Sequence, residues 1–187
     1  MKKVMTSQFF KKSTNSFLSE VLKLNKMFFI LLMIFLSINS FSQSNQRFSI
    51  VKRDNFLNSL RTSSTRNAPS YDAVLDLMDG VQSSIYLTNN QVKTFGTKPV
   101  CMYSDIASLG LANSSGLLVN YIEMVTIKID RPSQLNSPID LSVVSSYKSV
   151  KYIYFRVSFD FELAQLIQAI KNCDTKCIVI YSIEKGA

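Results

Sequence analysis

The hydrophobic positions between residues 141 and 155 change their spacing part-way along the segment. Apolar or aromatic side chains stand at every third position and then alternate to the end of the segment: Leu141, Val144, Tyr147, Val150, Ile153 and Phe155. A three-residue spacing is typical of tight helical turns, whereas alternation is typical of a strand. The segment therefore predicts a helical connection that gives way to a strand at Ile153.

Similar strand patterns stand on either side of this segment. We expect strands at 122–129 (IEMVTIKI), 150–157 (VKYIYFRV) and 177–183 (CIVIYSI). The stretch FELAQLIQAIKN predicts a helix before the last strand, with Asp160 as its N-cap. Val125 to Ile153 is a step of 28 residues, and Ile153 to Ile178 is a step of 25. Strands that recur at such intervals and are joined by short helices predict parallel, right-handed βα units.

The preceding part of the chain predicts a polar segment and then the start of the domain. Residues 43–69 are rich in Ser, Thr, Asn and Arg, so we expect a polar linker there, with a short strand or helical turn at its apolar patches, 48–51 and 56–60, followed by a loop. Ser70 can cap a helix that ends at Gly80, short strands are expected at 84–87 and 99–103, and Asp105 can cap a brief helix. Residues 70–187 are thus predicted to be a single α/β domain.

The pattern L141xxV144xxY147xxV150xxI153xF155 resembles the leucine-rich repeat, and I122xxV125xI127 and I178xI180 resemble the strand cores of flanking units. The resemblance covers roughly residues 117–183 and implies short parallel βα units with an open concave sheet face. It departs from the family at the asparagine position after each strand core, which is occupied by Asp130, Ser158 and Ile183. The alternative is a small, compact, layered α/β domain with the same strands.

The N-terminal residues have the pattern of a secretory signal peptide. Lys23 and Lys26 precede a 12-residue stretch, 27–38, that has no charge, and small residues follow at Ser40 and Ser42. A membrane span needs about 20 apolar residues, so this stretch is too short. We therefore expect a signal peptide at 1–42, with residues 1–26 as a possible upstream extension if translation begins at Met27. The SFSQ ending resembles the leaders of Bacteroidota-type bacteria, and the protein is expected to be secreted or periplasmic.

The positive charge of the chain is concentrated in this leader. The formal net charge is +8, but residues 1–42 hold six Lys and one acid. Removing them from the 21 basic and 13 acidic residues leaves 15 and 12, a net charge of +3. A nearly balanced domain is a poor phosphate-binding surface, so we expect no nucleic-acid partner.

The residue types exclude several kinds of active site. The chain has no His, which excludes Ser-His-Asp and Cys-His pairs and HExxH zinc sites, and it has no glycine-rich phosphate loop. In an oxidising compartment Cys173 and Cys177 could form a disulfide; the alternative is that both stay reduced. Cys101 stands among apolar residues and is expected to be buried. We predict no metal ion and no cofactor.

Alternation along the predicted strands gathers aromatic and basic side chains on one sheet face. If Val125 and Ile153 point inward, the opposite face carries the following residues, with Tyr181 beside them: Lys128, Tyr152, Tyr154 and Arg156. Such residues are common in binding hot spots, although a helix could instead cover them. We therefore expect a non-catalytic protein of the secreted or cell-envelope compartment that binds an unknown protein or envelope component. The alternative is a small hydrolase that uses carboxylates or a thiol.

Overall fold

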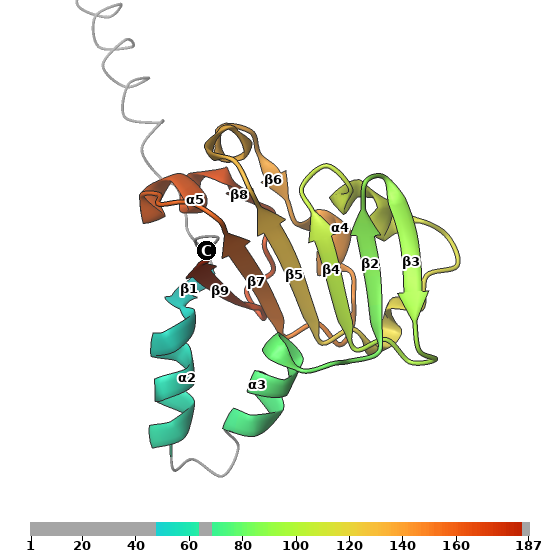
Figure 1. Cartoon of the computed structure of the whole chain (residues 1–187), viewed down its shortest axis with the longest axis horizontal. Coiled ribbons are helices and arrows are strands. Elements are labelled where there is room, and N and C mark those ends of the chain that lie inside the picture. Colours follow the sequence, from blue (N-terminus) through green and yellow to red (C-terminus); the bar gives the residue numbers. More distant parts are fainter. Residues whose placement is uncertain (1–47, 64–68, 185–187) are drawn as a thin grey trace, which may run out of the picture. The chain divides into compact units, whose positions relative to one another are not determined.

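The fold is an α/β structure built on one seven-stranded, mostly parallel sheet, as seen in a computed structural model that describes residues 48–63 and 69–184. The order across the sheet is β1-β9-β7-β5-β4-β2-β3 (Figure 1). The strands are β1 (Ser49–Lys52), β2 (Ser84–Thr88), β3 (Gln91–Phe95), β4 (Cys101–Asp105), β5 (Met124–Ile129), β7 (Tyr152–Val157) and β9 (Ile178–Ile183). The predicted α/β class is confirmed, and the expected signal peptide and its extension lie outside the described residues.

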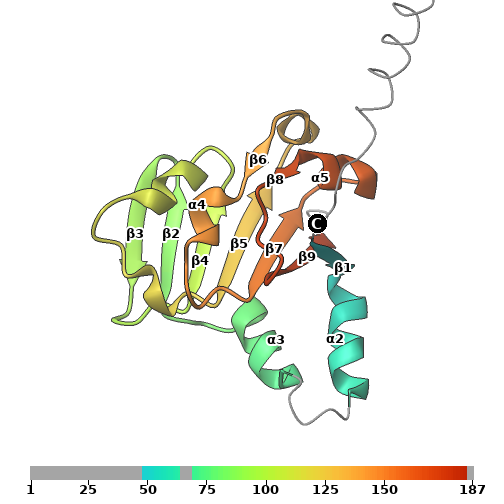
Figure 2. The same ribbon diagram turned by 180° about the vertical axis from the view of Figure 1, so that it is seen from behind.

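Five of these strands lie side by side in chain order: β2, β4, β5, β7 and β9, all parallel to their neighbours. Only β3 is antiparallel within the sheet, because it forms a hairpin with β2. The connections are η2 (Leu109–Asn113), η3 (Val119–Tyr121), η4 (Pro132–Asn136), α4 (Ser142–Ser145) and α5 (Leu163–Ala169), with a small second sheet of β6 (Ile139–Asp140) and β8 (Ile170–Lys171). The helix α4 lies behind the strands in Figure 1 and in front of them in Figure 2.

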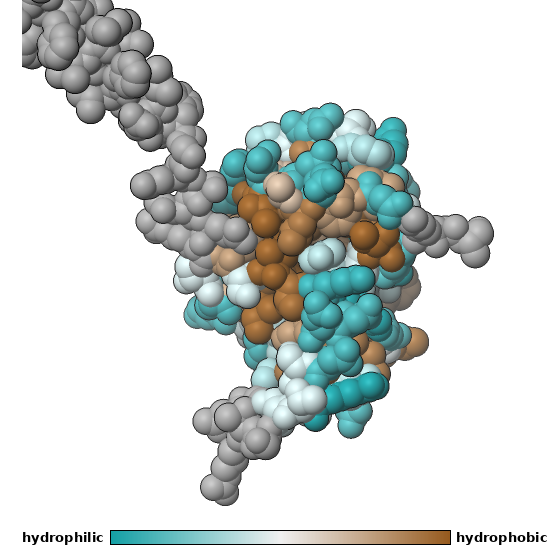
Figure 3. Space-filling model, turned by 90° about the vertical axis from the view of Figure 1, so that its left-hand side faces the viewer, coloured by the Kyte–Doolittle hydropathy of each residue, from teal (hydrophilic) through white to brown (hydrophobic). Residues whose placement is uncertain are grey.

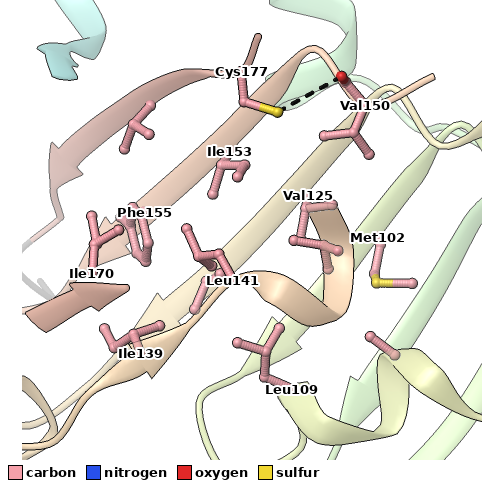
Figure 4. Packing of buried hydrophobic residues seen from close by; sticks show 14 of the residues in the cluster. Met102, Leu109, Val125, Ile139, Leu141, Val150, Ile153, Phe155, Ile170 and Cys177 are labelled. Carbon is pink, nitrogen blue, oxygen red and sulfur yellow. Dashed lines mark hydrogen bonds between the residues drawn. The ribbon is translucent and has the colours of Figure 1, made fainter. Parts of the chain in front are cut away.

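We call the sheet face packed against these connections the inner face. All five residues of the three-residue spacing, from Leu141 to Ile153, are buried there at 4% exposure or less. Figure 4 shows Leu141, Ile139 and Ile170 packed over Val125 and Phe155 of the sheet. The change of spacing thus marks the point where a connection over the inner face returns to its strand.

The opposite, outer face is partly covered by two helices, α2 (Arg53–Thr62) and α3 (Tyr71–Asp79). Phe56 of α2 packs on Tyr152 with ring centroids 5.9 Å apart. Within the predicted linker, residues 49–62 form β1 and α2, a strand and a ten-residue helix where the sequence predicts only a short strand or helical turn. The polar residues that suggested a linker lie on the exposed side of α2, while Phe56 and Leu57 are buried.

Two smaller expectations are also corrected. The hairpin strand β3 is absent from the sequence prediction, since none of its five residues is buried. The last helix begins after Glu162, whose reciprocal bonding with Gln165 forms a capping box, so Asp160 is not its N-cap.

Candidate functional site

The outer face has a covered part and an open part. Over β7, the rings of Tyr152 and Tyr154 lie beneath α2 and α3 and are 3% and 1% exposed. Over β2 and the later part of β4, no described helix lies in front of the strands (Figure 1), whereas α3 covers Cys101, the first residue of β4, whose Sγ donates to the Leu77 carbonyl oxygen at 3.4 Å. Tyr86 of β2 is 36% exposed there, so the same side-chain type is core on one part of the face and surface on the other.

Three aromatic rings meet on the open part, and we call Tyr86, Tyr103 and Phe95 the open aromatic patch. The rings of Tyr86 and Tyr103 are stacked with centroids 4.9 Å apart, and Phe95 meets Tyr86 edge-on at 5.5 Å. The three residues come from adjacent strands β3, β2 and β4, because the sheet register places them on one side. Partial burial raises the pKa of Tyr103 to about 12, so its hydroxyl stays protonated at neutral pH.

A row of charged and hydroxyl side chains follows at the carboxyl ends of β5, β7 and β9 on the same face. Lys128 Nζ lies 2.9 Å from Asp130 Oδ1, and Ser158 donates to the same oxygen at 3.0 Å. Arg156 Nε donates to both carboxylate oxygens of Glu184, at 3.0 and 2.8 Å. These partners lower the pKa values of Asp130 and Glu184, so both carboxylates are ionised at neutral pH.

A buried hydroxyl connects this row to the covered part of the face. The Tyr154 hydroxyl donates to Ser182 Oγ at 2.8 Å, and Ser182 Oγ donates to Glu184 Oε1 at 3.0 Å. Burial raises the pKa of Tyr154. The network fixes the Glu184 carboxylate from one side while Arg156 holds it from the other.

The predicted binding residues are thus divided by the structure. Lys128 and Arg156 are exposed on the outer face as expected, whereas Tyr152 and Tyr154 share the face but are buried under the helices. Tyr181 is on the inner face, where its ring meets Phe161 edge-on at 5.7 Å. The placement of Tyr181 beside the other tyrosines is therefore wrong.

A shift of one residue in β9 explains this error. Ile153 pairs with Val179, not with Ile178, so the step between the strands is one residue longer than the spacing suggested. The segment CIVIYSI is apolar at both alternations, and a strand buried on both faces gives no signal for which side points inward. The same shift brings Glu184, in place of Ile183, next to Ser158 in the row that continues from Asp130.

The three cysteines are free thiols in the structure, which corresponds to the reduced alternative for Cys173 and Cys177. Burial raises the pKa of Cys101 to about 11 and, together with the nearby Cys177, that of Cys173 to about 12. Burial also raises the pKa of Cys177. Because the thiolate is the reactive form, all three thiols are poor nucleophiles at neutral pH.

Other candidate chemistry is weak in the described part of the chain. Residues 48–63 and 69–184 contain no group of three or more Cys, Asp or Glu placed to hold a metal ion. The carboxylates of α3, Asp72, Asp76 and Asp79, are exposed on one helix side. Within the same residues no helix has the length and apolarity needed to cross a membrane.

Sequence reasoning missed Tyr86 and Phe95, the most exposed rings of the open aromatic patch. A signal was present, since Asn89 and Asn90 separate two short β-prone segments and Asn is favoured where both turn residues need positive φ. Recognising this two-residue turn predicts that the two segments pair as a hairpin, which places Phe95 on the same sheet face as Tyr86.

Comparison with known proteins gives no further guide. No protein family, curated protein or solved structure matches the chain. The resemblance to leucine-rich repeats therefore stays a prediction, and the function is argued from the site alone.

Proposed function

We propose that the protein is a non-catalytic binding protein, secreted or associated with the cell envelope, that holds a protein partner on the open part of its outer face. The observation that carries the proposal is the open aromatic patch on the same sheet face as the exposed side chains of Lys128 and Arg156. Tyrosine and arginine supply much of the energy of protein interfaces, because they combine apolar area with hydrogen bonding.

The ion pairs in the charged row beside the patch can be replaced by ion pairs with a partner protein. Arg156 and Glu184 have side chains 44% and 40% exposed, and Lys128 and Asp130 are 61% and 46% exposed. Exposed ion pairs contribute about 0–1 kcal/mol, so a partner could replace one at little cost. These pairs hold the long side chains in place over the face before a partner arrives, which reduces the entropy lost on binding.

The competing hydrolase has less support from the same residues. A thiol nucleophile needs a lowered pKa, and the pKa values of all three thiols are raised. A carboxylic general acid needs a raised pKa, and the pKa values of Asp130 and Glu184 are lowered. The raised pKa values of the thiols and the lowered pKa values of the two carboxylates both favour binding over hydrolysis as the function of this face.

Secretion is supported by the sequence alone, through the uncharged stretch at 27–38 and the small residues that follow it. We propose that residues 1–42 direct export and are removed. The N-terminal residue of protein recovered from the medium or periplasm tests this, with Gln43 or a near neighbour expected.

Site-specific crosslinking in the producing cell tests the binding face. A photoreactive residue at Tyr86 is expected to capture a defined partner, and the same residue at Leu163 is the control. The two positions are equally exposed, at 36% and 37%, but Leu163 lies on α5 beyond the inner face. The side of the molecule that carries β1 and α5 also has apolar surface (Figure 3), so the control tests whether exposed apolar side chains alone suffice.

The added variant Phe95→Ser is expected to weaken capture at Tyr86, because it removes the ring that meets Tyr86 edge-on. Equal capture at both positions, or capture at Tyr86 that Phe95→Ser does not change, would contradict a partner site on this face.

A further inference from the structure

One outer edge of the sheet is formed by β3, which has a neighbour on one side only among residues 48–63 and 69–184. It pairs with β2, and all five of its residues are exposed. In a hairpin with a two-residue turn, the residues flanking the turn form a hydrogen-bonded pair and the pairs alternate from there. Gln91, Lys93 and Phe95 therefore bond to β2, while Val92 and Thr94 direct their N–H and C=O groups away from the sheet.

The edge is held rigidly at the turn. Asn89 and Asn90 have φ values of 53° and 55°, the left-handed pair that a type I′ turn requires. The backbone N–H of Asn89 donates to Asp105 Oδ2 at 3.0 Å, and the backbone N–H of Asn90 donates to Ser108 Oγ at 2.9 Å. The turn is thus tied to the end of β4 and to the loop that follows it.

The other end of β3 is fixed as well. Ser83 Oγ donates to the carbonyl oxygen of Phe95 at 3.0 Å. The next residue, Gly96, has φ +81°, and a Cβ placed there would lie 2.1 Å from Ser83 Oγ, so only glycine fits. A strand fixed at both ends presents its free N–H and C=O groups without the ordering cost that a mobile edge would have.

The charge of this edge favours an acidic occupant. The described residues hold twelve basic and twelve acidic side chains, but residues 81–104 hold Lys93 and Lys98 and no acid. Lys93 lies opposite Tyr86 in the hairpin, and therefore on the outer face beside the open aromatic patch. A second copy fits less well, because antiparallel pairing of β3 with itself about its middle residue places Lys93 opposite Lys93, and like charges opposite each other are destabilising.

We propose that β3 accepts an extended segment of the partner protein as an eighth strand, with an acidic side chain opposite Lys93 and apolar or aromatic side chains beside the open aromatic patch. Main-chain hydrogen bonds to Val92 and Thr94 supply affinity, and the alternating side chains on the outer face supply selectivity. This inference rests on the proposed function and specifies how the partner is held.

A synthetic peptide tests strand addition directly. The probe is acetyl-Thr-Tyr-Thr-Glu-Thr-Tyr-Thr-amide, whose alternation places Glu and both Tyr on one side. In hydrogen-exchange NMR, the amides of Val92 and Thr94 are expected to exchange more slowly when the peptide is added, whereas those of Gln91 and Lys93, already bonded to β2, change little. A peptide N-methylated at the two threonines beside Glu keeps the side chains but cannot pair, and is expected not to bind.

Variants of the protein test the same contacts. Thr94→Pro removes an outward N–H while leaving the bonds to β2, so it is expected to abolish peptide binding in a folded protein. Thr94→Val keeps the N–H and is the matched control, expected to bind. Lys93→Glu is expected to weaken binding about fivefold or more, and a peptide with Lys in place of Glu to restore it.

The outcomes separate this inference from the proposed function. Binding that does not protect Val92 and Thr94, unchanged binding to Thr94→Pro, or no binding at about millimolar peptide would overturn strand addition. Protection of β3 that grows with protein concentration and needs no peptide would assign the edge to a second copy. If the partner captured at Tyr86 is still captured by Thr94→Pro, the binding face stands and strand addition fails.

Discussion

The inner and outer faces of this sheet are made by alternate residues of the same strands, yet they are organised differently. The inner face is apolar along β5 and β7 and is covered along its length by the connections between strands. The outer face carries tyrosines from β2 to β7, and α2 and α3 bury only those of β7. Tyr154 and Tyr86 therefore differ in role because of what covers them, and not because of their type or their place in the alternation.

The sharpest test of the comparison is a large-to-small substitution on each face. Phe155→Ala removes a fully buried inner-face ring and is expected to lower the free energy of unfolding by about 3–5 kcal/mol. Phe95→Ala removes a ring that is 57% exposed and is expected to lower it by less than about 1 kcal/mol. Urea titration measures both, and similar losses would show that the open aromatic patch is as much a part of the core as the inner face.

A smaller effect is expected from one hydroxyl on the covered part of the outer face. Tyr154→Phe removes the buried donor to Ser182 and is expected to cost about 1–2 kcal/mol of stability. Tyr86→Phe, on the open part, removes the hydroxyl of a residue that is 36% exposed and is expected to cost nothing measurable. Thermal or urea unfolding of the two variants compares them, and equal effects would contradict the division of the face.

The ion pair of Arg156 and Glu184 is expected to contribute less, with a defined pH dependence. Arg156 lowers the pKa of Glu184 below its ordinary value of 4.5, so the unfolded chain binds this proton at a higher pH than the folded protein. The contribution is complete above about pH 4.5 and is lost as the pH falls through the folded value.

The variant Arg156→Gln measures this contribution. Its deficit in unfolding free energy is expected to be below about 1 kcal/mol near pH 7, because both side chains are partly exposed, and to shrink toward zero as the pH falls below 4.5 and through the lowered pKa of Glu184. Lys128→Gln, which removes the partner of Asp130, is the matched comparison on the neighbouring strand. A deficit that stays constant with pH would assign the effect to packing of the Arg156 side chain.

Only a small change in stability is expected for Tyr86→Ser, although this variant removes a whole ring of the proposed binding site. Tyr86→Ser should alter the unfolding free energy by no more than about 0.5–1 kcal/mol, since the ring is already 36% exposed. Its loss should nevertheless reduce binding of the seven-residue peptide, measured by fluorescence anisotropy. A variant that is strongly destabilised would place Tyr86 with the structural tyrosines.

The sequence was sufficient for the strands β2, β4, β5, β7 and β9 and for the inner face of β5 and β7, because alternation and three-residue spacing report directly on burial. It identified Lys128 and Arg156 as exposed on one face. It could not assign the faces of β9, where both alternations are apolar, and so Tyr181 was misplaced. It allowed that a helix could cover Tyr154 but did not identify α2 as that helix, since a polar helix of ten residues with two buried side chains has the composition of a linker.

The pairing of β1 with β9 has a consequence for the order of folding. Each of β4, β5, β7 and β9 finds a parallel partner among the residues immediately before it, with register steps of 26–28 residues from β5 onward. Ser49, in contrast, pairs with Ile178 across nearly the whole described chain. Closing so long a loop is slow, and its entropic cost is offset only when the partner strand β9 is already in place. We expect the strands to pair in order from the β2–β3 hairpin toward β9, with β1 and α2 docking last. The tyrosines of β7 are then the final part of the core to become buried.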